Sequence, residues 1–176
     1  MSDRSSSVEI AVLNQISHTL VHEHNVSELL RKVLNILDKE MGLIRGTITL
    51  RQGETLFIEA SNGLTADEVN RGKYMIGEGI TGKVAKTGRP AVIPDISKEP
   101  EFLGRTQARP RKSHIAFVCV PVIHLDNVIG TLSIDRETAP ANELEQDLKL
   151  LETVANIIAE AVASCLEQHE ERRQLL

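Results

Sequence analysis

The spacing of apolar residues changes along this chain, from a helical period at both ends to strand-like alternation in the middle. Near the start, apolar residues recur every three or four positions, which predicts amphipathic helices over residues 7–24 and 26–41. A capping box beginning at Ser6 predicts the start of the first helix. Asn25 is expected to cap the second helix, and Gly42 to end it.

The middle of the chain alternates apolar and polar residues with a period of two, which is typical of strands. The expected strands cover residues 46–50, 56–61, 91–93, 114–124 and 127–136, with short helices at 66–71 and 80–86. A tight turn at Leu125 and Asp126 joins the last two strands. Hairpin-connected strands with helices segregated around them predict an α+β fold with a central antiparallel sheet.

The end of the chain, residues 141–176, lacks glycine and proline and predicts one long helix. Apolar residues alternate spacings of four and three, as in a coiled-coil seam. Two readings stay open: the helix packs on its own sheet, or its second half meets a partner helix, for which a homodimer is expected. The predicted seam comprises Leu148, Leu151, Ala155, Ile158 and Val162.

Charge and cysteine content narrow the classes of function. The chain has 20 basic and 25 acidic residues, a net charge of -5, which argues against an electrostatic binder of nucleic acid or membrane surfaces. The two cysteines form no CxxC motif, so neither a disulfide framework nor a metal knuckle is predicted. Neither a signal peptide nor an apolar run long enough to span a bilayer is evident. We expect a cytoplasmic protein.

Two sequence features bear on whether the chain is an enzyme. Gly77, Gly82 and Lys83 have P-loop spacing, but Val84 stands where Ser or Thr would hold magnesium, so nucleotide hydrolysis is not predicted. Cys119 lies in an apolar strand, where a thiol is normally inert, and the histidines flanking that strand fall on its other face. We predict no catalytic residue.

No metal site is predicted either. His18 and His22 are four residues apart on one helical face, a spacing that can bind a metal ion. Without acidic or thiol ligands close by, these histidines are expected to be ordinary surface residues.

A basic cluster marks the longest predicted loop, residues 95–113. Guanidinium groups there can clamp a dicarboxylate or phosphate, and loops over a sheet are where ligands are usually held. The alternative is a solvated loop with no ligand. The candidate ligand-binding residues are Arg105, Arg109, Lys73, Arg111, Gly77 and Gly79.

Three segments carry a resemblance to the GAF domain family: GEGITGKVAKTGRPAVIPDIS, FVCVPV and VIGTLSIDR. More narrowly, MGLIRGTITL, ASNGL, RGKYMIGEGITGKV and LGRTQAR resemble the N-terminal regulatory domain of nitrogen-fixation-specific, sigma-N-dependent activators. The resemblance implies a PAS-like fold with the first, second and last helices on one side of the sheet. It places a small-molecule pocket on the other side, beneath loops and short helices.

The resemblance also implies a domain organisation and a role. Residues 1–25 would form a dimerisation helix, 26–140 the GAF core, and 141–176 a connection to a downstream ATPase domain that this chain lacks. The expected role is a sensor that transmits binding of a small molecule, or of an inhibitory regulatory protein, to that ATPase domain. No cofactor is required, and a dicarboxylate resembling 2-oxoglutarate is the expected effector.

Two alternatives remain open. In the first, the domain is an interaction module without a ligand, its pocket filled by Tyr74, Met75 and Phe102. In the second, it is a redox or nucleotide-processing enzyme. The signature of cyclic-nucleotide-binding GAF domains, a bilin-attachment cysteine and the cysteine set of the methionine-sulfoxide reductases are all missing from the sequence.

Overall fold

The computed structural model describes residues 2–108 and 114–174. Five α-helices, six strands and one 3-10 helix are found within these ranges. In chain order they are α1 (Ser2–His22), α2 (Val26–Met41), β1 (Arg45–Gln52), β2 (Thr55–Asn62), α3 (Ala66–Arg71), β3 (Lys73–Met75), α4 (Gly79–Thr87), β4 (Ala91–Ile93), η1 (Ile96–Lys98), β5 (Ile115–His124), β6 (Asn127–Glu137) and α5 (Ala141–Gln174).

All six strands form one sheet in the order β3-β2-β1-β6-β5-β4, and every neighbouring pair is antiparallel. The predicted α+β class and antiparallel sheet are therefore confirmed. The tight turn between β5 and β6 also lies where it was predicted. Leu125 and Asp126 both have positive φ angles, 46° and 63°, as a two-residue hairpin turn requires.

The helix termini follow the predicted signals at α2 but not at α1. The Asn25 side chain accepts a 3.0 Å hydrogen bond from the Glu28 backbone N–H, and Gly42 ends α2 with a φ of 66°. The capping box at Ser6 does not start α1, which already begins at Ser2. No glycine or proline among residues 2–6 interrupts the helix, so it extends beyond the predicted cap.

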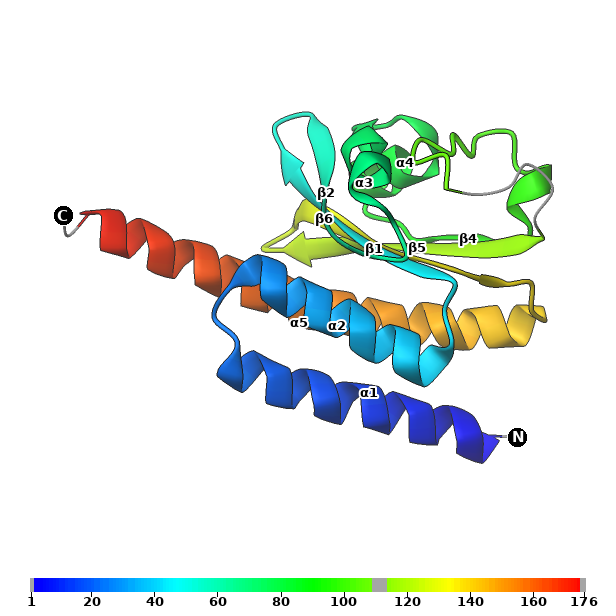
Figure 1. Cartoon of the computed structure of the whole chain (residues 1–176), viewed down its shortest axis with the longest axis horizontal. Coiled ribbons are helices and arrows are strands. Elements are labelled where there is room, and N and C mark those ends of the chain that lie inside the picture. Colours follow the sequence, from blue (N-terminus) through cyan, green and yellow to red (C-terminus); the bar gives the residue numbers. More distant parts are fainter. Residues whose placement is uncertain (1, 109–113, 175–176) are drawn as a thin grey trace.

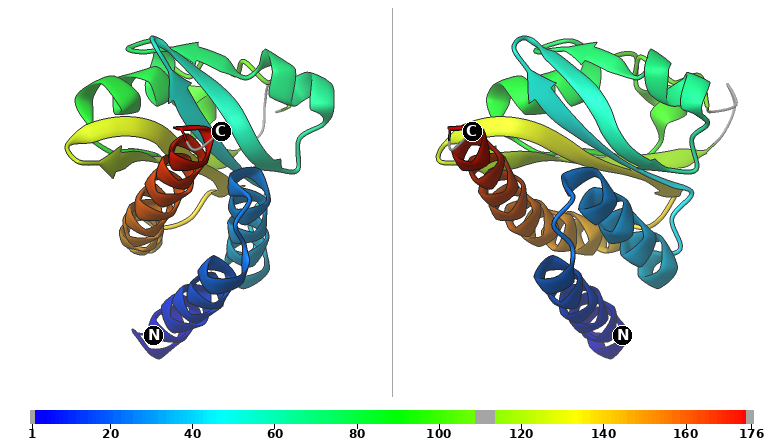
Figure 2. Two further views of the ribbon diagram at one scale, coloured as in Figure 1. Left: turned by 90° about the vertical axis from the view of Figure 1, so that its left-hand side faces the viewer. Right: turned by 60° about the vertical axis from the view of Figure 1, so that its left-hand side comes forward.

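The helices cover one face of the sheet in two layers. α2 and α5 pack directly on the sheet, and α1 lies outside them, mainly against α2 (Figure 1). Views from the side show the same arrangement, with α1 separated from the sheet by the inner layer (Figure 2). α3, α4 and the loop after β4 lie over the opposite face (Figure 1).

The main core fills the space between the sheet and the inner helices. Ile48 of β1, Val118 of β5 and Leu132 of β6 pack with Leu34 of α2, and all four are fully buried. A smaller apolar cluster lies on the other face, under α4. The sheet is therefore buried on both sides at its centre.

The predicted seam of α5 faces this core. Leu151, Ala155, Ile158 and Val162 are at most 1% exposed within the single chain, and Leu148 packs at the edge of the same cluster. The structure corrects their assignment as a seam between chains, because an amphipathic helix lying on a sheet shows a similar stripe to one in a coiled coil. The last turns of α5 extend past the sheet (Figure 1).

Candidate functional site

The two central strands carry polar residues on the face away from the inner helices. Side chains alternate between the faces of a strand, and the intervening Ile48 and Leu132 point into the core. The Thr49 and Thr131 hydroxyls are 2.7 Å apart. We call this set of three cross-strand pairs the polar ladder: Arg45 with Asp135, Thr47 with Ser133, and Thr49 with Thr131.

A pocket lies over one end of the polar ladder. The first turn of α4 and the segment Phe102–Gly104 cover it, so it occupies the position that the resemblance implies. Its free interior is about 20 Å³, which is room for roughly one water molecule. The lining residues are Arg45, Thr47, Leu64, Tyr74, Gly79, Ile80, Thr81, Phe102, Leu103, Gly104, Thr106, Phe117 and Ser133.

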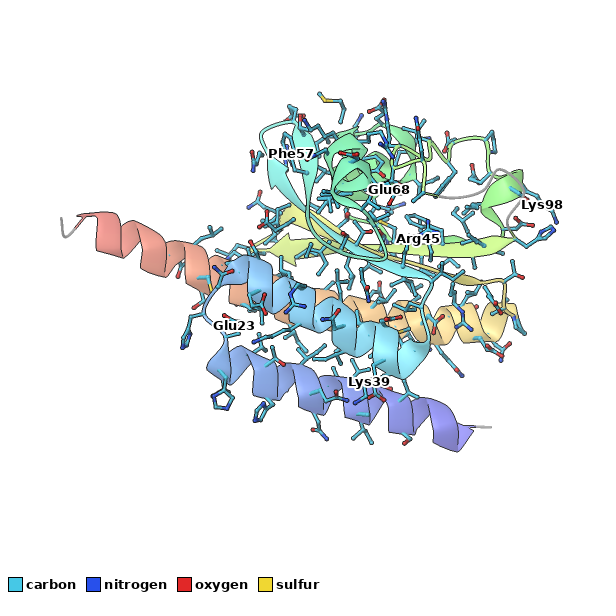
Figure 3. All side chains as sticks on the ribbon, viewed as in Figure 1. Glu23, Lys39, Arg45, Phe57, Glu68 and Lys98 are labelled. Atoms are coloured by element: carbon cyan, nitrogen blue, oxygen red, sulfur yellow. The ribbon has the colours of Figure 1, made fainter. Side chains whose placement is uncertain are left out.

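Arg45 is the charged side chain among these lining residues. Figure 3 shows it on the side of the sheet away from α2 and α5. Its Nη1 lies 3.6 Å from Oδ2 of Asp135, which is close enough for an ion pair but too long for a hydrogen bond. Nη1 is buried and has no hydrogen-bond partner among the residues described. A buried donor in this state costs about 1–3 kcal/mol.

The first turn of α4 contributes Gly79, Ile80 and Thr81 to the lining of the pocket. The first hydrogen bond of this helix joins Gly82 N to Glu78 O, at 3.0 Å. The N–H groups of Gly79, Ile80 and Thr81 therefore have no acceptor inside the helix, as in the first turn of any α-helix. The N-cap residue Glu78 provides no side-chain cap. This end of the helix carries partial positive charge.

The structure places two of the predicted ligand-binding cations outside the pocket. Arg105 is bound to the carboxylate of Glu78, and its side chain is 42% exposed. Lys73 is exposed on β3, with Nζ 5.6 Å from the centroid of the Phe57 ring. Neither side chain lines the pocket, and their contact with a ligand stays a prediction.

The other predicted site residues are two glycines and two loop arginines. Gly79 lines the pocket and has a φ of 59°. Gly77, with a φ of 89°, does not line it. Arg109 and Arg111 lie outside the described residues.

Aromatic side chains fill much of the space beneath the cover. The Phe102 ring meets the Phe117 ring edge to face, with 5.2 Å between their centroids. Tyr74 lines the same pocket. Met75, which was expected with them, is 50% exposed and does not line it.

Cys119 is fully buried beside this pocket, within the smaller apolar cluster. Burial raises the pKa of its thiol to about 12, although hydrogen bonds with Thr131 and Thr81 act in the opposite direction. The thiol therefore stays protonated at neutral pH and is a poor nucleophile. This agrees with its predicted structural role.

The described ranges contain neither a cluster of metal ligands nor a helix that could span a bilayer. Residues 2–108 and 114–174 contain no group of three His, Cys, Asp or Glu side chains placed to hold a metal ion. The His18 and His22 rings lie 4.6 Å apart on the exposed face of α1. Within the same ranges, no helix combines the length and apolar character needed to cross a bilayer.

Sequence reasoning missed Arg45, although the sequence contains a signal for it. Residues 45, 47 and 49 of one strand and 131, 133 and 135 of another are all polar and all of one parity. Such a pattern predicts a polar face on each strand. The pairing of these two strands, far apart in sequence, was needed to bring the two faces together.

Comparison with known proteins gives relatives along almost the whole chain. The nitrogen fixation protein AnfA of Azotobacter vinelandii is 37% identical over 94% of this chain and 32% of its own length. The Nif-specific regulatory protein of Herbaspirillum seropedicae is 36% identical over 99% of this chain and 33% of its own length. The chain thus spans about a third of the length of these regulators.

Solved structures and a family model agree on the fold. The GAF domain of Nlh2 from A. aeolicus, in an inactive state, superposes with a TM-score of 0.81 at 27% identity, covering 90% of this chain and 98% of that one. The free methionine-R-sulfoxide reductase of Neisseria meningitidis shares the fold alone, with a TM-score of 0.79 at 18% identity over 96% of this chain and 95% of that one. The GAF domain model matches residues 25–162. This chain therefore belongs to the GAF domain family.

Proposed function

We propose that this chain is the sensory and dimerisation module of a nitrogen-fixation transcriptional activator, and that it is not an enzyme. The observation that carries the proposal is the similarity to nitrogen-fixation regulators along nearly all of the chain. The buried, protonated thiol of Cys119 supports the absence of nucleophilic catalysis at the pocket. The effector would be a small molecule such as a dicarboxylate, and the setting would be the cytoplasm.

The proposed module has three parts. Residues 1–25 supply the outer helix, 26–140 the GAF core, and 141–176 the connection to an ATPase domain that follows in the full-length protein. The relatives are about three times longer than this chain, which leaves room for such a domain. The last turns of α5 extend beyond the sheet and provide a rigid connection (Figure 1).

A contact through the sheet supports a route from the pocket to the helices. Arg45 lies on the pocket side of β1, and Gly46 is the next residue along the strand. A Cβ atom at Gly46 would lie 2.9 Å from Cδ2 of Leu34, so α2 packs directly on the backbone of β1 there. A movement of β1 at Arg45 would therefore displace α2.

Switching requires that the ligand bind the two helix arrangements with different affinities. A ligand that binds both arrangements equally shifts neither, however tightly it binds. Useful coupling between two sites amounts to about 1–3 kcal/mol. The direct packing of α2 on β1 gives the ligand a means to favour one arrangement.

The proposed homodimer would form through the helical layer, with a different surface from the buried stripe of α5. A groove of about 690 Å³ runs between the end of α1 and α5, and Leu20, Ile157 and Ala161 are among its lining residues. Val21, the residue after Leu20 in α1, is 70% exposed. Sedimentation equilibrium should show a dimer that Val21→Glu weakens and that the control Leu125→Glu, at the 79% exposed hairpin turn, leaves intact.

The regulatory role is tested in the full-length protein with a nitrogenase-promoter reporter. Deletion of residues 1–140 should abolish the response of the reporter to nitrogen status while the remaining protein still accumulates. An unchanged response after this deletion would contradict the proposal. Immunoblotting of both proteins provides the control for their abundance.

One observation favours a second candidate function, an interaction module without a ligand. The free interior of about 20 Å³ is largely closed by aromatic side chains, including Phe102 and Tyr74. In this case the surface would receive an inhibitory regulatory protein, and the pocket would be part of the core. Native mass spectrometry of the freshly purified chain separates the candidates, because a retained small molecule would exclude this second one.

A further inference from the structure

We propose that the pocket binds a small organic anion whose carboxylate is held by Arg45 together with the first-turn N–H groups of α4. This inference rests on the proposed sensory function and deepens it, because it assigns the groups of this chain that would anchor the ligand. It transfers the ligand contact from the loop cations to a residue of the central sheet.

One nitrogen of the Arg45 guanidinium is an unsatisfied hydrogen-bond donor within the described part of the chain. Nη1 is buried, lacks a hydrogen-bond partner among the described residues, and belongs to a side chain that lines the pocket. The pairing with Asp135 at 3.6 Å supplies charge but no hydrogen bond to this nitrogen. An oxygen atom of an anion is the ligand group that would satisfy the donor and strengthen the charge interaction.

The surrounding groups favour an anion over a cation. Gly79, Ile80 and Thr81 line the same pocket, and their N–H groups have no acceptor within α4. Asp135 is 1% exposed and is not among the lining residues, so its carboxylate does not form part of the pocket wall. Hydroxyl groups of Thr47 and Ser133 complete the polar side, and both can donate a hydrogen bond.

The size of the pocket determines how a ligand could enter it. A space of about 20 Å³ accommodates one carboxylate oxygen beside Arg45 but not the rest of an organic acid. The remainder of the ligand requires the Phe102–Gly104 segment to move away. Leu103 in this segment is 45% exposed, so it buries less apolar surface than a core residue does. The segment is therefore held less firmly than the core. Opening of this cover would make binding slower than diffusion.

The loop cation Arg105 is the natural rival and also the matched control. It carries the same guanidinium group beside the N-cap of α4, but it is already bound to Glu78 and its side chain is 42% exposed. If charge near the cover were sufficient for anion binding, loss of either arginine would weaken binding alike. If the buried donor is the anchor, only loss of Arg45 would do so.

Isothermal titration calorimetry on the whole chain tests this distinction. The probes are 2-oxoglutarate, succinate and inorganic phosphate, measured against wild type, Arg45→Gln and Arg105→Gln. We expect binding of at least one dicarboxylate, a loss of roughly ten-fold or more in affinity for Arg45→Gln, and a change below about two-fold for Arg105→Gln. Equal affinity of wild type and Arg45→Gln would overturn the inference, as would a wild-type protein that binds none of the probes.

The substitution Arg45→Gln removes the ion-pair partner of the buried Asp135 and could unfold the chain. A second variant separates loss of binding from loss of folding. In the double variant Arg45→Gln/Asp135→Asn the buried pair is neutral, and circular dichroism verifies its fold. This variant should also lose dicarboxylate binding, and retained binding would refute the anchor. The reporter response after deletion of residues 1–140 is independent of these titrations, so a failed anchor with a lost response would leave the sensory function standing.

Discussion

Replacing Leu151 by alanine should destabilise the chain as a monomer, because its side chain is fully buried in the intramolecular core. The substitution removes three carbon atoms, which corresponds to about 2.4 kcal/mol at about 0.8 kcal/mol per buried methylene group. A cavity that collapses incompletely raises the total, and buried Leu→Ala changes cost about 2–5 kcal/mol. For a domain of this size, a loss of 3 kcal/mol lowers Tm by about 6–12 °C.

Leu166→Ala is the matched control, since it makes the same chemical change at a position of α5 that is 55% exposed. It should cost less than about 1 kcal/mol. Urea denaturation at two protein concentrations about a hundred-fold apart distinguishes the two environments, because stability that depends on an interface between chains rises with concentration. The reasoning is refuted if the two variants lose equal free energy, or if the loss for Leu151→Ala disappears on dilution.

Three further outcomes follow from the local structure. Gly82→Ala should lower the free energy of unfolding by about 1–3 kcal/mol in urea titrations, because its Cβ would lie 2.2 Å from the Met75 carbonyl oxygen. Asn25→Ala should cost about 1 kcal/mol in the same assay, since it removes the cap on the Glu28 N–H. Burial raises the pKa of Cys119 from the ordinary thiol value of 9.0 to about 12, so between these pH values the thiol ionises only in the unfolded state. The free energy of unfolding of the wild type, measured relative to Cys119→Ala, should therefore decrease as the pH rises from 9 to 12.

The fold was largely predictable because its signals are local. The cap at Asn25, the stop at Gly42 and the turn at Leu125 and Asp126 each depend on a few adjacent residues, and the structure contains all three. The register of α5 was also readable, but what it packs against was not. An apolar stripe on a helix does not identify the surface that covers it, and here that surface is the chain's own sheet.

The candidate site was less predictable because it depends on pairing between distant strands. Arg45 and Asp135 become neighbours only when β1 and β6 pair. Arg105 and Lys73 were predicted to bind the ligand because both are basic. Arg105 lies in the long loop, and Lys73 lies beside the glycine-rich turn. A loop arginine with an acidic neighbour, here Glu78, satisfies its charge locally, and no pattern of spacing predicts that contact.

The two faces of the sheet have opposite chemistry at the same strands. On β1, Arg45 lines the pocket while Ile48 packs into the helical core, and Gly46 lets Leu34 of α2 approach the backbone between them. Close-packed interiors transmit displacement because they contain few voids to absorb it. A ligand that draws Arg45 away from Asp135 would therefore act on α2 through the thickness of one strand. In this arrangement, the proposed sensory site and the helices on the other face of the sheet need no flexible linker between them.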